Sequence, residues 1–273
     1  MYTIKEIGLA DNRRLVQYNV DEVFGSKFYL KGFEYPWILS SREWKAGEKI
    51  LDVGAAYSPL PIHIADTYDC QVWAVDDFGS ASDDEFWLRN QNPQEHIQAY
   101  PQVKYVMERL GDPAASSLPE GFFDCIYSAS TLEHVPKTYS ASVWRHMDQL
   151  LKPGGCMLHA IDIGLRTTRG VLSIAKSLLL EWLGPLLPPN LKASYSMHTP
   201  RLYAYNAFHA LGLNARPIRS LPNALQAAIQ PEIMLESPKT FYHRVVKDNL
   251  TPATMARRIA LLLHLEKHPE KGN

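Results

Sequence analysis

The stretch KILDVGAAYSPLP, residues 49–61, constrains the fold more than any other part of the 273-residue chain. An apolar run at residues 50–53 is interrupted by Asp52, and Gly54 then opens a turn of small residues. Apolar residues recur at helical spacing over residues 60–65. A buried strand, a glycine turn and a helix in this order predict the start of a βαβ unit. In such folds a ligand binds beside that first turn, at the carboxyl ends of the strands.

The remaining chain continues the alternation of strands and helices, which predicts an α/β fold with a doubly wound, mainly parallel sheet covered by helices on both faces. The last two expected strands are close in sequence, so we expect the final strand to be antiparallel. Strands are expected at residues 70–76, 103–110, 122–130, 156–163, 215–220 and 239–247, and helices at residues 139–151 and 201–211.

Three segments lie outside this regular pattern. Residues 1–45 are rich in aromatics and are expected to cover one sheet edge, or to fold over a ligand through GFEYPW, where Pro36 favours an extended backbone over a helix. Within the main domain, residues 46–250, an insertion at about 164–200 carries an amphipathic segment expected to form a lid helix, or a helix that contacts a partner or a membrane surface. Residues 251–273 are expected to form an accessory helix.

Composition excludes several classes of protein. The net charge is -1 and the basic residues are scattered, which disfavours a nucleic-acid partner. The three cysteines are far apart and form no CxxC pair, so we expect reduced thiols in a cytoplasmic protein, without a disulfide framework or a metal site. Neither a signal peptide nor a membrane-spanning segment is expected.

Three acidic residues lie at or just past expected strand ends: Asp52, Asp76 and Asp112. Those ends converge on one crevice in a doubly wound sheet. A carboxylate after the second strand suits a ribose, because it accepts hydrogen bonds from both hydroxyls. The turn has neither GxGxxG nor the P-loop pattern, so the sequence indicates a nucleoside ligand that lacks phosphates.

Five segments together resemble the class I S-adenosylmethionine-dependent methyltransferases, over about residues 48–163. They are ILDVGAA at 50–56, VWAVD ending at Asp76, GDPAASSLPEGFFD at 111–124, SASTLEHV at 128–135 and LLKPGG at 150–155. The resemblance implies a seven-stranded Rossmann-like sheet and S-adenosyl-L-methionine as the cofactor.

The resemblance also implies which residues bind the cofactor. The first turn would line its methionine end, Asp76 would hold the ribose hydroxyls, and the loop after the third main strand would face the adenine. The implied cofactor-binding residues are Asp52, Gly54, Ala55, Ala56, Asp76, Asp77, Leu110, Gly111, Asp112 and Ser128, with Phe78 as an alternative to Asp77 beside the adenine. The family usually has GxGxG in the turn; here Ala56 and Ser58 replace the later glycines.

The sequence therefore predicts methyl transfer to a hydroxyl or amine of a small molecule, sugar or glycan. His134 is the catalytic candidate as a general base, with a structural role as its alternative; His159, Asp162 and His198 are further candidates. Two other functions stay open: a cofactor-binding module without turnover, and a protein or RNA methyltransferase. The sequence does not indicate an oligomeric state.

Overall fold

The computed structural model describes residues 1–9, 31–78, 92–113, 116–165, 188, 200–213 and 257–269. The strands are β1 (Tyr2–Leu9), β2 (Lys49–Val53), β3 (Gln71–Val75), β4 (Val103–Val106), β5 (Phe123–Ala129), β6 (Leu151–Leu165) and β7 (Arg257–Lys267). The helices are α2 (Lys31–Ser40), α3 (Leu60–Tyr68), α5 (Pro93–Ala99), α6 (Lys137–Leu150) and α9 (Pro200–Ala210).

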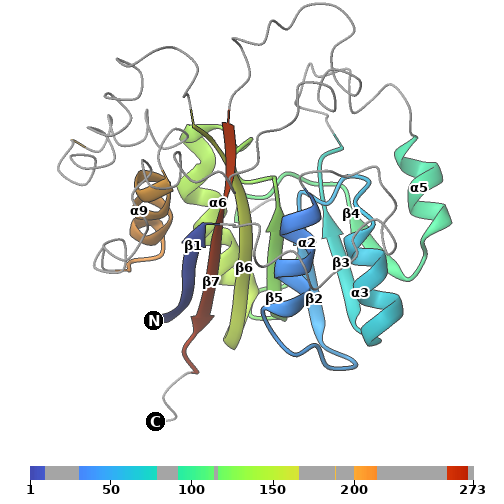
Figure 1. Cartoon of the computed structure of the whole chain (residues 1–273). Helices are drawn as coiled ribbons and strands as arrows, with labels where there is room; N and C mark the ends of the chain where they lie inside the picture. Colours follow the sequence, from blue (N-terminus) through green and yellow to red (C-terminus); the bar gives the residue numbers. More distant parts are fainter. Residues whose placement is uncertain are drawn as a thin grey trace, which may run out of the picture.

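The strands form one seven-stranded sheet in the order β1-β7-β6-β5-β2-β3-β4 (Figure 1). Strands β2 to β6 run parallel, whereas β7 is antiparallel to both β6 and β1. The carboxyl ends of the five parallel strands therefore meet at one edge of the sheet. This arrangement confirms the expected mainly parallel, Rossmann-like fold with an antiparallel strand.

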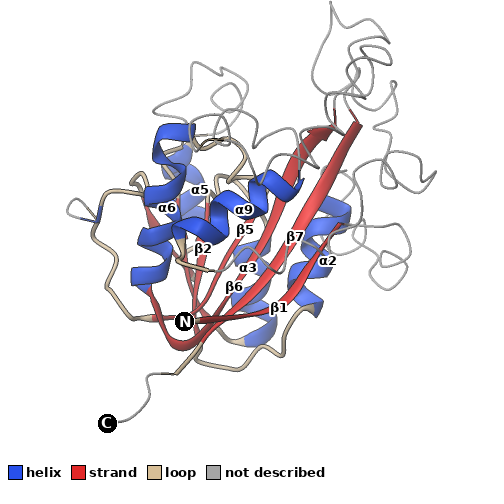
Figure 2. Cartoon of the chain, turned by 90° about the vertical axis from the view of Figure 1, so that its left-hand side faces the viewer, coloured by secondary structure: helices blue, strands red, loops and turns tan. Residues whose placement is uncertain are grey.

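Helices cover both faces of the sheet (Figure 2). Helices α6 and α9 pack on one face and share a hydrophobic core with Leu51, Ile126 and Met157. Helices α2 and α3 pack on the other face, in a second core. Central strand β2 is buried on both faces, which explains its nearly continuous apolar sequence.

Helix α2 corrects the expectation that Pro36 favours an extended backbone in GFEYPW. Pro36 lies inside the helix, and an interior proline costs about 3 kcal/mol because it removes a backbone hydrogen bond. Burial outweighs this cost: α2 buries the large apolar side chains Tyr35, Trp37, Ile38 and Leu39, and each such burial stabilises the fold by about 1.5–3 kcal/mol.

The expected accessory helix at residues 251–273 is also wrong, because residues 257–267 form strand β7. Leucine favours helices, but this apolar run is placed between two strands, with β6 on one side and β1 on the other. Residues 260–265 are all buried. A short apolar run that is buried on both faces does not reveal from its period whether it is a strand or a helix.

The expected cover segment at residues 1–45 includes an edge strand, since β1 pairs with β7. Most of the expected lid insertion at about 164–200 lies outside the described residues, as do the expected strands at 215–220 and 239–247. Within the part of the chain that the structure describes, no helix is long and apolar enough to cross a bilayer.

Candidate cofactor site

Gly54 directly follows β2 at the carboxyl edge of the sheet. Its backbone conformation, with φ of 73°, favours glycine. Its N–H donates to the carbonyl of Val75, 2.8 Å away, which ties the turn to β3. The hydroxyl of Thr131 donates to the Gly54 carbonyl at 3.1 Å. A Cβ at Gly54 would lie 1.9 Å from Cγ2 of Thr131, so both the conformation and the packing require glycine.

The rest of the turn is closed by Ser58, at the position of one of the glycines that the family usually has. The Ser58 N–H donates to the carbonyl of Ala55 at 2.8 Å. Its hydroxyl accepts from the N–H of Leu60 at 3.2 Å, in the first turn of α3, and contacts the hydroxyl of Tyr35 at 2.9 Å. Ser58 directly precedes Pro59, the N-cap of α3, and its side chain accepts the first N–H of the helix, which glycine has no means to do.

Asp76 follows β3 and links the end of this strand to the turn after β2. One carboxylate oxygen accepts from the N–H of Ala56 at 2.9 Å, and the other accepts from the N–H of Phe78 at 2.6 Å. Burial raises the pKa of Asp76, while these two N–H donors act in the opposite direction. Each carboxylate oxygen retains a further lone pair, so the group can also accept hydrogen bonds from a diol.

Aromatic side chains surround the position next to Asp76. The ring of Phe78, which has a φ of 50°, lies edge-on to Tyr57 at 5.6 Å and tilted to Tyr105 at 6.4 Å. His96 of α5 contacts Tyr57 and Tyr105, with ring distances of 5.2 and 5.3 Å. This cluster suits a flat heterocycle such as adenine.

Asp77, the neighbour of Asp76, has a different environment. Its carboxylate forms an ion pair with Arg109, at 3.1 Å from Nη2. The Arg109 side chain is about half exposed, so the pair contributes little to stability. Of the two residues expected beside the adenine, Phe78 belongs to the aromatic cluster and Asp77 pairs with Arg109.

The segment Leu110–Asp112 is fixed by α6. Gly111 has φ of 120° and donates its N–H to Nδ1 of His146 at 3.1 Å. Burial lowers the pKa of His146, against the nearby acids Glu108 and Asp112, and this favours the neutral ring that accepts this bond. Leu110 is buried and Asp112 is exposed.

Asp52 is buried in β2, beneath the turn. Burial raises the pKa of Tyr105 and of Tyr127, and the Asp52 carboxylate raises both further. Asp52 therefore lies close to two phenol groups, that of Tyr127 on the neighbouring strand β5 and that of Tyr105 on β4, two strands away on the other side. This position is suited to holding the turn in place from below.

Ser128 is fully buried in β5, and its hydroxyl lies 2.8 Å from Nδ1 of His159 on β6. The His159 ring packs edge-on against Trp144 of α6 at 4.9 Å. Burial lowers the pKa of His159 to about 3, so the ring is neutral. The side chain of Ser128 therefore faces the core, and His159 is part of the core under α6.

A second polar group lies at the carboxyl ends of β5 and β6, under α2. The hydroxyl of Ser130 lies 2.6 and 2.8 Å from the two carboxylate oxygens of Glu34, and 3.2 Å from Oδ2 of Asp162. Glu34 is 1% exposed and Asp162 is 7% exposed. Ser130 directly precedes Thr131, which packs against Gly54, so this cluster lies beside the cofactor turn.

His134, the expected general base, lies in the segment after β5. Its side chain is 74% exposed, and Nε2 lies 3.9 Å from Oε1 of Glu133. His198 lies outside the described residues. Of the candidate bases named from the sequence, Asp162 is the one that the described structure places in a buried polar cluster beside the turn.

Sequence reasoning missed several members of this site. Glu34 is an acid between the aromatic residues of GFEYPW, and a lone acid inside an apolar run is the signal that would have singled it out. Tyr105 and His96 carry no local motif, because their role depends on the packing of α5 against β4.

The residues present fit S-adenosylmethionine. Gly54 permits the tight turn against which Thr131 packs, Asp76 supplies acceptors for a ribose diol, and the aromatic cluster around Phe78 suits adenine. No phosphate-binding loop is required. The expected residues Gly54, Ala56 and Asp76 are brought together by direct hydrogen bonds or by the shared turn.

Several solved structures are similar to this chain at low sequence identity. The phosphoethanolamine N-methyltransferase 2 of Haemonchus contortus is 16% identical, with a TM-score of 0.49, over 92% of this chain and 56% of the enzyme. The chain thus spans little more than half of that enzyme. A putative S-adenosylmethionine-dependent methyltransferase of Methanococcus maripaludis is 16% identical, with a TM-score of 0.45, over 93% of this chain and 92% of that one. A geranyl diphosphate methyltransferase is 13% identical, with a TM-score of 0.47, over 95% and 87% of the two chains.

A comparison with curated protein sequences gives no match. The family model described as a methyltransferase domain matches residues 37–215, which is more than half of the 273 residues. The matched region contains the turn at Gly54, Asp76 and the segment around Gly111. The chain therefore belongs to the methyltransferase domain family, which confirms the expected class I assignment and S-adenosylmethionine as its cofactor.

Proposed function

We propose that this protein transfers the methyl group of S-adenosylmethionine to a hydroxyl or amine of a small molecule, sugar or glycan. The observation that carries the choice of acceptor group is the buried pair Glu34 and Asp162 around the Ser130 hydroxyl. A hydroxyl or ammonium group must lose a proton when it is methylated, and a carboxylate held beside the reacting atoms is a suitable base.

The position of the cluster beside the cofactor turn supports this role. Ser130 and Thr131 are consecutive, and the Thr131 side chain fills the space over Gly54. The Ser130 hydroxyl has one proton and therefore donates to one carboxylate at a time. The carboxylate that does not accept this hydrogen bond, whether Glu34 or Asp162, is then able to accept a proton from the acceptor. We therefore assign the proton-accepting role to Glu34 and Asp162 together. Glu34 lies closer to the Ser130 hydroxyl than Asp162 does, so we test the role by substitution of Glu34.

When bound, the cofactor supplies a methyl group on a positively charged sulfur. The protein has to bind it, align the acceptor and remove a proton. Asp76 and the turn at Gly54 would hold the cofactor, and Glu34, Ser130 and Asp162 would orient the acceptor. Alignment of two reactants alone lowers barriers by up to roughly 7–11 kcal/mol in well-oriented systems.

His134 is the second candidate base, and a pair of substitutions separates the two. We expect Glu34→Gln to lower kcat by about 100-fold or more, the usual range for loss of a general base, with little change in cofactor affinity. We expect His134→Asn to lower kcat by less than about threefold, because the His134 side chain is 74% exposed and lies outside the buried cluster of Glu34, Ser130 and Asp162. Both rates are measured by S-adenosylhomocysteine release. The opposite ranking would transfer the role to His134.

The acceptor is found by following transfer of a labelled methyl group to a library of alcohols, amines and sugars. Calorimetry comes first: we expect a 1:1 heat of binding with S-adenosylmethionine, and no binding at millimolar cofactor would overturn the proposal. Binding without any transfer would favour a module without turnover. Label on protein or RNA would favour a macromolecular substrate; of the two, RNA is disfavoured by the scattered basic residues.

We also propose a cytoplasmic location. The three cysteines, Cys70, Cys125 and Cys156, are free and buried, as is usual for proteins of a reducing compartment.

A further inference from the structure

Two of the cysteines face each other at the edge of the sheet opposite the cofactor turn. Cys125 of β5 and Cys156 of β6 are direct partners in the parallel register, so their side chains lie on the same face. Both are free thiols; Cys125 is fully buried and Cys156 is 7% exposed. Adjacent strands lie about 4.8 Å apart, which is within the usual range of Cα separations in a disulfide.

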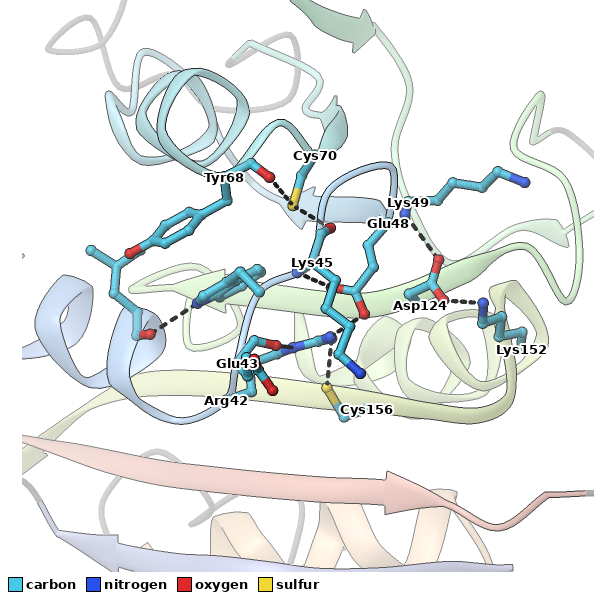
Figure 3. A network of polar contacts seen from close by, with 12 residues as sticks. Arg42, Glu43, Lys45, Glu48, Lys49, Tyr68, Cys70, Asp124, Lys152 and Cys156 are labelled. Atoms are coloured by element: carbon cyan, nitrogen blue, oxygen red, sulfur yellow. Dashed lines mark hydrogen bonds and ion pairs between the residues drawn. The ribbon is translucent and has the colours of Figure 1, made fainter.

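Cys156 lies in a basic environment (Figure 3). Nη1 of Arg42 donates to its sulfur at 3.4 Å, and Nη2 of the same guanidinium pairs with Glu48 at 2.5 Å. A hydrogen bond from Cys125 lowers the pKa of Cys156 against the effect of burial, and His264 and Arg42 lower it further. Burial raises the pKa of Cys125. These opposite shifts favour a thiolate at Cys156, whose sulfur accepts from Arg42, and a protonated thiol at Cys125.

Cys70 provides a contrast within the same molecule. Its sulfur donates to the carbonyl of Lys45 at 3.4 Å. Burial raises the pKa of Cys70 to about 11. Like Cys156 it is 7% exposed, but its sulfur contacts the backbone carbonyls of Lys45 and Tyr68, whereas that of Cys156 contacts the Arg42 guanidinium. The thiolate is the reactive form of cysteine, and we expect Cys70 to be inert under conditions where Cys156 reacts.

We propose that Cys125 and Cys156 form a redox-modification site, in which Cys156 reacts with a hydroperoxide and Cys125 resolves the product as a disulfide. The Cys156 sulfur attacks one oxygen of hydrogen peroxide, the O–O bond breaks, and the hydroxide that leaves takes a proton from solvent. The sulfenic acid is then attacked by the Cys125 sulfur. The S–O bond breaks, its oxygen leaves as water with the Cys125 proton, and the S–S bond forms. Two thiols are oxidised by two electrons, and the peroxide is reduced to water.

Alkylation of the native full-length protein tests the reactivity of Cys156 without any substitution. Tryptic cleavage separates the three cysteines into the fragments 50–89, 110–137 and 146–166. At about pH 6.5, well below the pKa of an ordinary thiol, we expect iodoacetamide to modify Cys156 at least about tenfold faster than Cys70. Equal rates for the two thiols would overturn the proposal.

A matched pair of variants tests the source of this reactivity. Arg42→Gln removes the cation at the sulfur and is expected to slow alkylation of Cys156 by about tenfold. Glu48→Gln leaves Arg42 in place and removes only its acidic partner, so the rate should not fall. Thermal unfolding of both variants shows whether they are folded. A folded Arg42→Gln variant with an unchanged rate would contradict the basic environment as the cause.

Peroxide treatment of the Cys70→Ser protein tests the pair itself. We expect the mass to fall by two hydrogen atoms, with fragments 110–137 and 146–166 linked and separable by a reductant. In a Cys70→Ser/Cys125→Ser variant, Cys156 should stop at a sulfenic acid that dimedone traps. Over-oxidised Cys156 with Cys125 still free in the Cys70→Ser protein would overturn the assignment of Cys125. None of these readouts depends on methyl transfer, so they stand apart from the proposed function.

Discussion

Replacement of Gly54 by alanine is expected to weaken the binding of S-adenosylmethionine strongly. The new Cβ would lie 1.9 Å from Cγ2 and 2.5 Å from Oγ1 of Thr131, and overpacking of this kind costs about 1–3 kcal/mol. The left-handed backbone at Gly54 adds about 1–2 kcal/mol. The turn must move to relieve both, so we expect calorimetry to show at least a tenfold rise in Kd for S-adenosylmethionine, and urea unfolding to show lower stability.

Gly47 is a matched control for the backbone conformation. Its φ of 77° is close to that of Gly54, but a Cβ there would meet nothing within 4 Å. Gly47→Ala should therefore cost only about 1–2 kcal/mol in stability and leave Kd unchanged. Adding Thr131→Ala to Gly54→Ala removes the two nearest atoms and should restore part of the affinity. A Gly54→Ala protein with normal Kd would show that the turn does not contact the cofactor.

The central half of the fold is predictable because its signals are local. A strand, a glycine and a helix in succession, followed by Asp76 after the next strand, predict both β2–α3–β3 and the crevice at their ends. Helix α6 has an apolar face at helical spacing and is expected at 139–151; it spans Lys137–Leu150. For these elements, the conformation that the local sequence favours is also the conformation found in the folded chain.

The conformations of β7 and α2 are not predictable from the sequence, because the elements packed against them determine which conformation forms. Residues 260–265 are buried between β6 and β1, and only this placement makes them a strand. In α2, the burial of Tyr35 and Ile38 outweighs the local effect of Pro36. A single sequence shows local preferences for both conformations, but it does not show the tertiary packing that determines which one forms.

The candidate site likewise contains some residues with a local sequence signal and others that only the tertiary structure brings together. Gly54 and Asp76 have local signals, whereas the Thr131 contact that makes Gly54 necessary joins residues from two different strand ends. The hydroxyl of Ser128 contacts His159 in the core, a contact that the sequence does not reveal, and the expected place of Ser128 near the sulfur of the cofactor stays a prediction. The cluster of Glu34 with Asp162 depends on α2 crossing the ends of β5 and β6, which only the tertiary structure reveals.

Asp76→Asn is expected to raise the Kd for S-adenosylmethionine at least tenfold. An amide has one acceptor oxygen in place of two, so it cannot accept from the N–H groups of Ala56 and Phe78 and from both hydroxyls of a ribose. Loss of a hydrogen bond to a charged group costs about 1.5–3 kcal/mol, and 1.4 kcal/mol corresponds to tenfold in Kd. Calorimetric titration measures the change, with circular dichroism to check the fold.

The pH dependence of binding gives an independent test of the same carboxylate. Burial raises the pKa of Asp76 in the folded protein above the ordinary value of 3.8. Its protonation therefore begins at a higher pH than in an exposed aspartate, and removes acceptors for the diol. Affinity should fall as the pH is lowered through this raised pKa, while the contribution of Asp76 to folding stability changes in the opposite direction and is lost as the pH rises through the same range.

Asp77→Asn is the control for both measurements, because Asp77 is adjacent in sequence but pairs with Arg109. It should change Kd by less than about threefold, since an exposed ion pair contributes about 0–1 kcal/mol. The acidic limb of the pH profile should remain but lie at slightly lower pH, because the Asp77 carboxylate is one of the groups that raise the pKa of Asp76. Asp76→Asn should instead remove the acidic limb of that profile. If Asp77→Asn weakened binding as much as Asp76→Asn, the ribose assignment would move to Asp77; if neither did, the diol would be held elsewhere in the crevice.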